Sequence, residues 1–172
     1  IVDEILDSNG DVDPLRMACC NAIKLNTECG RYQFMAAEPM SFKYLKILCS
    51  KGSYMLKNIH ITELVCPIPI INNYESKDSD LNKILAAARE TFIQNSFDIF
   101  MDCPSRERAG WLCDSYFLAI AEHELTGDNL VEQNFLENYM LPVNFENIPQ
   151  GMVSMCYPSD QDGGGFIPNW AL

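Results

Sequence analysis

A polar segment near the middle of the chain carries the residues best suited to chemistry. Residues 102–114 read Asp-Cys-Pro-Ser-Arg-Glu-Arg-Ala-Gly-Trp-Leu-Cys-Asp and interrupt two apolar, helix-like stretches. A plain helix connection needs only about 2–8 residues, so this longer loop invites a functional interpretation. Its chemistry suits a sugar, because an indole offers an apolar face to a pyranose ring while carboxylates and guanidinium groups bind hydroxyls. One carboxylic acid could also protonate a leaving oxygen.

The residues alone leave a second interpretation open. Charge-rich loops are common on protein surfaces. The same segment could be a solvated, salt-bridged loop with Trp111 anchored in the core. Composition does not decide between the two.

Three helices should position this loop. Apolar residues at three- and four-residue steps predict a helix that begins at Ser79 or Asp80, either of which can cap it. A second helix is predicted over about residues 113–125, ended by Gly127, and a third over about 129–140, ended by Pro142. The side chains expected to face the core are Leu81, Ile84, Leu85, Ala88, Phe92 and Ile93 in the first, Phe117, Ile120, Ala121 and Leu125 in the second, and Leu130, Val131, Phe135, Leu136, Tyr139 and Met140 in the third.

The chain before these helices has β-type composition. Tyr44–Cys49 alternates so that Leu45, Ile47 and Cys49 form one apolar face, and a further strand is predicted within residues 54–65. These patterns predict the edge of an antiparallel β domain over residues 1–71, followed by a polar linker at 72–79 and a helical domain at 80–172.

Composition excludes several classes of function. Twelve Lys and Arg against 24 Asp and Glu give a net charge of −12, which repels nucleic acid and anionic lipid. The longest apolar run, residues 64–71, contains two prolines and is well short of the roughly 20 residues of a membrane-spanning helix. The eight cysteines and two histidines lack zinc-ligand spacing, so we expect thiols, no metal site and no cofactor.

Two other polar groups are better explained without a ligand. Glu122, His123 and Glu124 are consecutive, so they point around a helix and predict a solvated face rather than a metal or acid–base site. Asp160 and Asp162 with the following glycines lack the spacing of a known calcium loop and predict a plain loop.

The pattern Asp-Cys-Pro-Ser-x-Glu-x-x-x-Trp-x-x-Asp resembles the signature of the inverting α-L-rhamnosidases of glycoside hydrolase family 78. The preceding helix, the segment at residues 42–47 and the turn at 126–128 are also similar to that family. The resemblance implies an α+β fragment in which the antiparallel edge of a β-sandwich is followed by the opening α-hairpins of an (α/α)6 toroid. It covers nearly the whole chain, and residues 102–114 carry its specific part.

Roles follow from the resemblance position by position. It implies that Glu107 is the general acid and that Asp102 and Asp114 hold the substrate's hydroxyls. An inverting hydrolase also needs a base about 6.5–9.5 Å from the acid. In the family this base is a glutamate in the second half of the toroid, which has no counterpart here. Asp102 is on the same loop as Glu107 and could not readily lie across the sugar from it.

Other residues at motif positions would shape the site. Arg106, Arg108 and Trp111 are assigned lining or supporting roles, and Trp170 matches a sugar-stacking tryptophan, although it could equally be a core residue. Cys113 stands where the family usually has glycine, which questions the local backbone shape more than the chemistry.

The resulting hypothesis is hydrolysis of terminal α-L-rhamnosides with inversion, on a rhamnose-containing oligosaccharide or glycoside. Two alternatives stay open, a six-hairpin glycosidase for another sugar and a noncatalytic carbohydrate-binding module. The chain begins without Met and stops where Pro168 suits a first helical turn, so we expect a segment cut from a longer parent. Alone, it should be inactive and should contact the rest of the parent or a second copy of itself.

Overall fold

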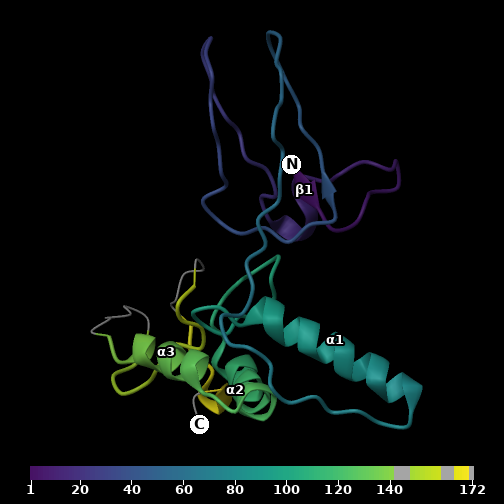
Figure 1. Ribbon diagram of the computed structural model, residues 1–172. Helices are drawn as coiled ribbons and strands as arrows, with labels where there is room; N and C mark the ends of the chain where they lie inside the picture. The colour runs from purple at the N-terminus through teal and green to yellow at the C-terminus, as the bar shows by residue number, and fades with distance from the viewer. Residues whose placement is uncertain (142–147, 160–164, 171–172) are drawn as a thin grey trace. The chain divides into compact units, whose positions relative to one another are not determined.

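The computed structural model describes residues 1–141, 148–159 and 165–170, and these divide into two compact units (Figure 1). The first unit comprises Ile1–Glu63 and the second Leu64–Leu172. The domain and linker bounds predicted from the sequence stay a prediction.

A small antiparallel sheet organises the first unit. Strand β1, Val2–Asp3, pairs with strand β2, Tyr44–Leu45, so that Val2 lies opposite Leu45 and Asp3 opposite Tyr44. The pairing continues one step further, because the N-terminal ammonium group donates to the Lys46 carbonyl at 3.0 Å. The chain's first residues are therefore tied down by a segment distant in the sequence.

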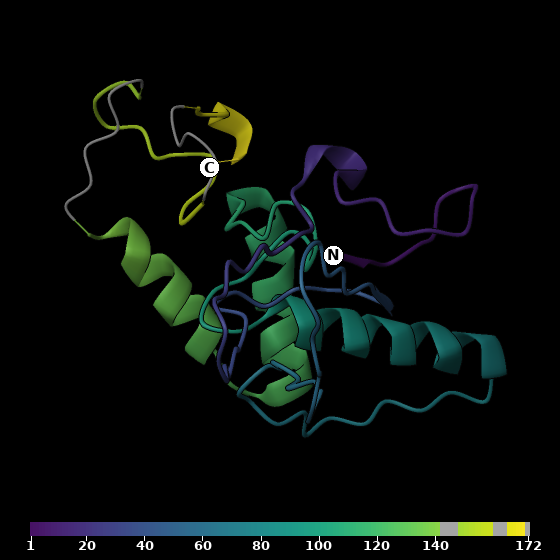
Figure 2. The same cartoon turned by 90° about the horizontal axis from the view of Figure 1, so that it is seen from above.

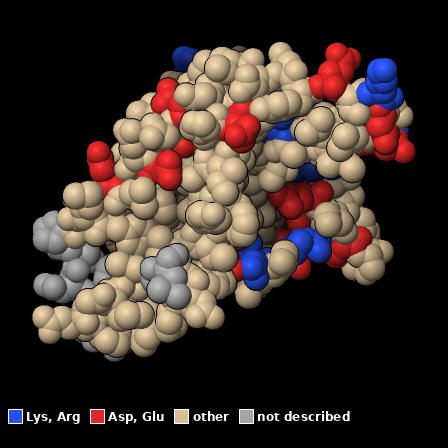
Figure 3. Space-filling model, turned by 90° about the horizontal axis from the view of Figure 1, so that it is seen from below, with Lys and Arg blue, Asp and Glu red and all other residues tan. Residues whose placement is uncertain are grey.

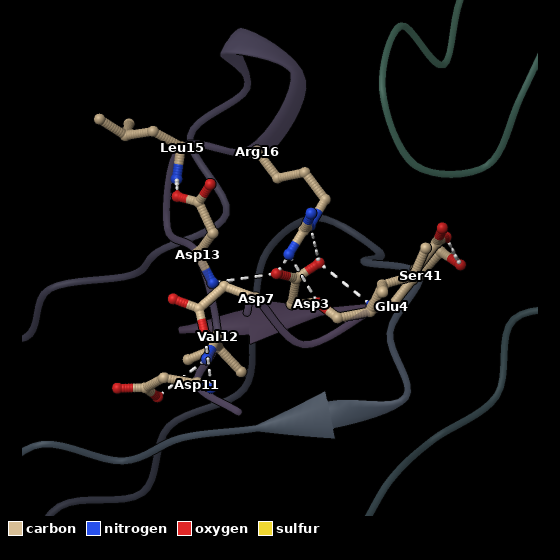
Figure 4. A network of polar contacts seen from close by, with 10 residues as sticks. Asp3, Glu4, Asp7, Asp11, Val12, Asp13, Leu15, Arg16 and Ser41 are labelled. Carbon is tan, nitrogen blue, oxygen red and sulfur yellow. Dashed lines mark hydrogen bonds and ion pairs between the residues drawn. The ribbon is translucent and has the colours of Figure 1, made fainter. Parts of the chain in front are cut away.

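Asp3 is the centre of a polar network beside this sheet (Figure 4). Its side chain is 1% exposed, and both of its oxygens accept from Nε of Arg16, at 2.7 and 2.9 Å. The Asp13 backbone N–H donates to the same carboxylate at 2.9 Å. The hydrogen bond from Arg16, followed by those from the backbone, holds the pKa of Asp3 well below its ordinary value. A buried charge is thus paired and hydrogen-bonded, as its burial requires.

The strand predictions are correct only in part. The strand expected over Tyr44–Cys49 is formed at Tyr44–Leu45 alone, and residues 54–65 contain no strand. The expected apolar face of Leu45, Ile47 and Cys49 is exposed rather than buried. The physical reason is a missing partner, because β composition produces a strand only where a second chain segment completes the ladder.

Helix α1, Ser79–Asn95, opens the helical part of the second unit. Its cap is Asp78, not Ser79 or Asp80 as predicted, since the Asp78 carboxylate accepts from the Asp80 and Leu81 backbone N–H groups at 2.8 and 3.4 Å. All three residues are of capping type, and only the backbone geometry decides which of them lies at the helix boundary.

Helices α2, Leu112–Thr126, and α3, Leu130–Tyr139, form a hairpin (Figure 2). Gly127 ends α2 in the left-handed conformation, at φ +70°, as predicted. Both later helices match their predicted ranges within a residue or two. Pro142, predicted to end α3, lies outside the described residues, as do Asp160, Asp162, Gly163 and Gly164.

The core of this unit lies where α1 ends and α3 begins. Its buried residues come from α1, from α3 and from the chain before and after α1, and partly buried residues of α2 pack against them. The buried cluster is formed by Ile68, Phe92, Ile99, Phe100, Met101, Val131 and Phe135. The rings of Phe100 and Phe135 have centroids 6.0 Å apart. Figures 1 and 2 show the N-terminal part of α1 extending away from α2 and α3.

The predicted inward faces are therefore wrong at several positions. Of the α1 stripe only Phe92 is buried, and the exposed apolar residues of the three predicted faces are Leu81, Ile84, Ala88, Phe117, Ile120, Leu130, Leu136 and Met140. Periodicity identifies an apolar face, but burial also needs a packed neighbour.

Glu122 corrects the prediction of a solvated face on α2. This residue is completely buried, whereas His123 and Glu124 are exposed. Its two oxygens accept from the Val131 and Glu132 backbone N–H groups at 2.8 and 2.9 Å, so it caps α3 from the neighbouring helix. Burial raises the pKa of the Glu122 carboxyl, although the two N–H donors act in the opposite direction.

No helix within the described ranges combines the length and apolar character needed to cross a membrane.

On the face drawn in Figure 3, uncharged side chains predominate and the acidic side chains form several separate groups.

Candidate functional site

The acidic loop between α1 and α2 is closed by its own first residue. Asp102 donates its backbone N–H to the Ala109 carbonyl at 3.1 Å, and its Oδ1 accepts from the Ala109 N–H at 3.0 Å. Inside this closure, the Glu107 N–H donates to Sγ of Cys103 at 3.3 Å. Arg108 takes a left-handed backbone conformation, at φ +51°, which an L side chain rarely adopts. The chain thus makes a tight turn that fixes the backbone of Glu107.

Glu107 lies in this turn with both oxygens engaged. Nε1 of Trp111 donates to Oε2 at 2.8 Å, and the Arg106 guanidinium forms an ion pair with Oε1. The Glu107 side chain is 17% exposed, whereas that of Arg106 is 46% exposed. The predicted acid is consequently mostly sheltered from solvent, whereas its ion-pair partner reaches the surface.

Asp114 completes a group of three carboxylates. It lies in the first turn of α2. Burial raises the pKa of Asp114, and the negative charges of Asp102 and Glu107 raise it further. The three acids that the motif predicts therefore interact with one another, and Asp114 holds a proton more readily than an isolated aspartate.

The two tryptophans lie together. The rings of Trp111 and Trp170 have centroids 5.2 Å apart and meet edge to face at 73°. Trp111 immediately precedes α2, and Trp170 ends the short 3₁₀ helix η2, Pro168–Trp170. Tertiary structure thus brings Trp170 against Trp111, whose indole N–H donates to Glu107.

A segment that the sequence analysis did not single out supports the loop from behind. Trp111 forms an isolated antiparallel bridge with Cys156, and Gly110 exchanges backbone hydrogen bonds with Tyr157 and Pro158 at 3.0 Å. Tyr139 of α3 also donates its hydroxyl to the Gly110 carbonyl at 3.3 Å. The sequence did offer one signal for this segment. The apolar run bounded by Gly151 and Pro158 has the composition of a short strand.

Cys156 contributes a buried thiol to this segment, residues 151–158, which we call the wall segment. Burial raises the pKa of Cys156 to about 11, and the charges of Asp102, Glu107 and Asp114 add to the effect. The thiol is therefore protonated at neutral pH and is a poor nucleophile or metal ligand. All eight cysteines are thiols, with none in a disulfide.

No cluster of His, Cys, Asp and Glu able to hold a metal ion occurs in the part of the chain that the structure describes. An apolar hollow of about 550 Å³ does occur in the second unit, and none of the predicted site residues lines it. Its lining residues are Leu64, Val65, Pro67, Phe97, Asp98, Leu130, Val131 and Asn134. The candidate site is therefore the acidic loop with its two tryptophans.

Comparison with known proteins gives one match. The model of the bacterial alpha-L-rhamnosidase six-hairpin glycosidase domain matches residues 71–172, which contain the three helices and the whole candidate site. Neither the curated proteins nor the solved structures contain a match to this chain.

Proposed function

Because the chain belongs to the bacterial alpha-L-rhamnosidase six-hairpin glycosidase family, we propose that residues 71–172 form part of a catalytic domain that hydrolyses terminal α-L-rhamnosides with inversion. The substrate would be a rhamnose-containing oligosaccharide or glycoside, and the chemistry needs only carboxyl groups and water. The helices would be the opening hairpins of an (α/α)6 toroid.

One observation carries the proposal: Glu107, whose side chain is only 17% exposed, belongs to one electrostatic group with Asp102 and Asp114. Glu107 would act as the general acid and protonate the glycosidic oxygen. Asp102 and Asp114 would bind the sugar's hydroxyls, and burial together with the charges of Asp102 and Glu107 raises the pKa of Asp114. This arrangement supports acid catalysis better than a solvated surface loop.

The remaining predicted residues would bind the sugar. The paired rings of Trp111 and Trp170 support an apolar contact with one face of the ring, and Arg106 and Arg108 would donate to hydroxyl oxygens. The general base would be a glutamate outside these 172 residues, because Asp102 is braced within the same turn as Glu107. In this proposal, activity requires the longer parent chain.

The decisive experiment is Glu107→Gln in the parent chain, assayed with phenyl α-L-rhamnoside, whose poor leaving group needs protonation. Turnover should fall by about 10²–10⁴-fold, the usual contribution of a general acid, while the circular dichroism spectrum and melting temperature stay unchanged. Glu124→Gln, on the exposed face of α2, is the matched control and should retain activity. Near-normal hydrolysis by the Glu107 variant would exclude its role as the acid.

The choice of sugar is tested separately, since the acid loop contacts only part of a substrate. A panel of aryl glycosides offered to the parent enzyme should show the highest kcat/KM for the rhamnoside. A preference for another sugar would keep the glycosidase assignment and replace the substrate. Binding of rhamnosides without turnover would instead support a noncatalytic carbohydrate-binding module.

A further inference from the structure

The hydrogen bond between Trp111 and Glu107 distinguishes the two oxygens of the carboxyl group. An indole N–H is a donor and has no acceptor capacity. Nε1 of Trp111 is 2.8 Å from Oε2 of Glu107, so this oxygen must accept. When Glu107 carries a proton, the carbonyl oxygen of the acid is a stronger acceptor than the hydroxyl oxygen, so the indole N–H favours Oε2 as the carbonyl oxygen and the proton on Oε1.

The indole is held firmly enough to impose this choice. The Trp111 carbonyl accepts from the Ser115 N–H at 2.9 Å and from the Ser115 hydroxyl at 2.7 Å, and its backbone pairs with Cys156. Its ring contacts the edge of Trp170. The first turn of α2, the wall segment and η2 therefore all fix the direction of the N–H.

The other oxygen has a different kind of partner. Oε1 forms an ion pair with Arg106, whose side chain is 46% exposed, so this partner can be displaced into solvent while the indole cannot. A cationic guanidinium offers only donors and must leave Oε1 before that oxygen can present a proton.

We propose that Trp111 is a positioning residue for the reaction: its N–H holds Oε2 of Glu107 as the acceptor oxygen and assigns the catalytic proton to Oε1, the oxygen that Arg106 covers in this structure. The inference rests on the proposed function. In the reacting step the proton passes from Oε1 to the glycosidic oxygen. The bond from that oxygen to the anomeric carbon breaks with its electron pair on the oxygen, while the oxygen of a water molecule bonds to the carbon and the water gives up a proton to the general base. The Glu107 carboxylate left behind is then stabilised by the Trp111 N–H and by the return of Arg106.

The hydrogen bond can be tested without catalysis, because the chain contains only two tryptophans. In a Trp170→Phe variant, the single indole N–H signal in a nitrogen–proton NMR spectrum belongs to Trp111. We expect this signal to shift with pH as Glu107 titrates and to become insensitive to pH in the double variant Trp170→Phe/Glu107→Gln. The charged and titratable groups nearby are Arg106, Asp102, Asp114 and Cys156, so Asp114→Asn in the same background is the control and should retain the titration.

The functional test uses the leaving group, because acid assistance matters most when the leaving group is poor. In the parent chain, Trp111→Phe should lower kcat at least tenfold for a phenyl rhamnoside and much less for a dinitrophenyl rhamnoside. Trp170→Phe keeps the Glu107 hydrogen bond, so it should affect both substrates equally. Equal losses on both substrates for Trp111→Phe, or an indole signal whose titration survives Glu107→Gln, would overturn the proposal.

Glu107→Gln separates this inference from the proposed function. If that variant spares the dinitrophenyl substrate and Trp111→Phe does not, the acid assignment stands and the role of Trp111 is wrong. If the loss of activity in Glu107→Gln does not depend on the leaving group, the acid assignment is wrong and the inference about Trp111 fails with the proposed function. Should Trp111→Phe not fold, the NMR titration in the Trp170→Phe background decides the question.

Discussion

Gly110 shows how tightly the acidic loop is packed. A Cβ atom at this position would lie 2.6 Å from the Tyr157 carbonyl oxygen and 2.7 Å from Cε2 of Phe135. Both distances are shorter than real Cβ contacts, and one of the atoms belongs to the backbone, so the wall segment would have to move. The glycine that precedes Trp111 is thus required by close approach, and not by an unusual backbone angle.

We expect Gly110→Ala to destabilise the second unit by about 1–3 kcal/mol, the usual cost of overpacking. Urea unfolding followed by tryptophan fluorescence measures this, since both tryptophans lie beside the loop. Gly30→Ala is the control, because its Cβ would first meet the Tyr32 ring at an ordinary 3.6 Å. An unfolding midpoint equal to that of the wild type would show that the wall segment does not pack as described.

Asp3 gives the first unit a predictable dependence on pH. Its pKa is lowered, so the folded state binds a proton less readily than the unfolded state. The stabilisation is therefore complete above the unfolded value of about 3.9 and is lost as the pH falls below it. Hydrogen exchange of the Asp13 amide, which donates to Asp3, should report this locally.

In this experiment, protection of the Asp13 amide, corrected for intrinsic exchange, should fall below about pH 4 and should already be reduced at pH 7 in Asp3→Asn. Glu4→Gln, an exposed neighbour, should leave the protection unchanged. Constant protection of the wild-type amide down to acidic pH would contradict the role of the Asp3–Arg16 pair.

Among the elements, the α2–α3 hairpin depends on one buried carboxylate. Glu122 satisfies two backbone N–H groups in the first turn of α3. Removing it by Glu122→Ala leaves the buried Val131 N–H without its acceptor, at about 1–3 kcal/mol, and the partly buried Glu132 N–H at a smaller cost. Glu122→Gln retains one acceptor and should cost less. Thermal or urea unfolding gives the comparison, with exposed Glu137→Ala on α3 as the control.

Glu122 should make the stability of the folded state depend on pH in the direction opposite to that of Asp3. Burial raises the pKa of Glu122, so the folded state binds the proton more tightly than the unfolded state. Stability should therefore decrease as the pH rises from the unfolded value of about 4.3 through the higher folded value, and Glu122→Gln should remove this slope. If the stability of the Glu122→Gln variant still decreased with rising pH in this range, another group would be responsible for the decrease.

Helix positions were predictable because capping residues, glycine at φ +70° and apolar periodicity act locally. The sequence did not predict correctly which face of each helix is buried. Phe117 and Ile120 lie on the apolar side of α2 and are exposed, while Ser115, Glu122 and Thr126 are buried. Which side of a helix is covered depends on the segments packed against it, and a polar side can be the covered one when its groups find partners.

For the whole molecule, the exposed apolar side chains on all three helices predict association. Leu81 and Ile84 on α1, Tyr116 and Phe117 on α2 and Leu136 on α3 are each at least 44% exposed. Exposed apolar patches larger than a few hundred Å² favour contact with another surface. We expect the chain to self-associate through these faces.

Light scattering coupled to size-exclusion chromatography measures this directly, at several protein concentrations. The apparent mass should rise above the 19.5 kDa of the monomer as the concentration increases. A double variant, Phe117→Ser/Ile120→Ser, should shift the distribution toward monomer without loss of helix content. A monodisperse monomer with a cooperative melting transition would contradict the prediction.

The three helices, the acidic loop between the first two and the family could be predicted from the residues, because caps, periodicity and a compact motif are all local properties of the chain. Only folding shows that Trp170 meets Trp111, that Cys156 and Tyr157 support the loop, and that Glu122 is buried as a cap for α3. Those contacts join segments far apart in the chain. Their formation depends on which surfaces find a complementary partner, and no local pattern encodes that choice.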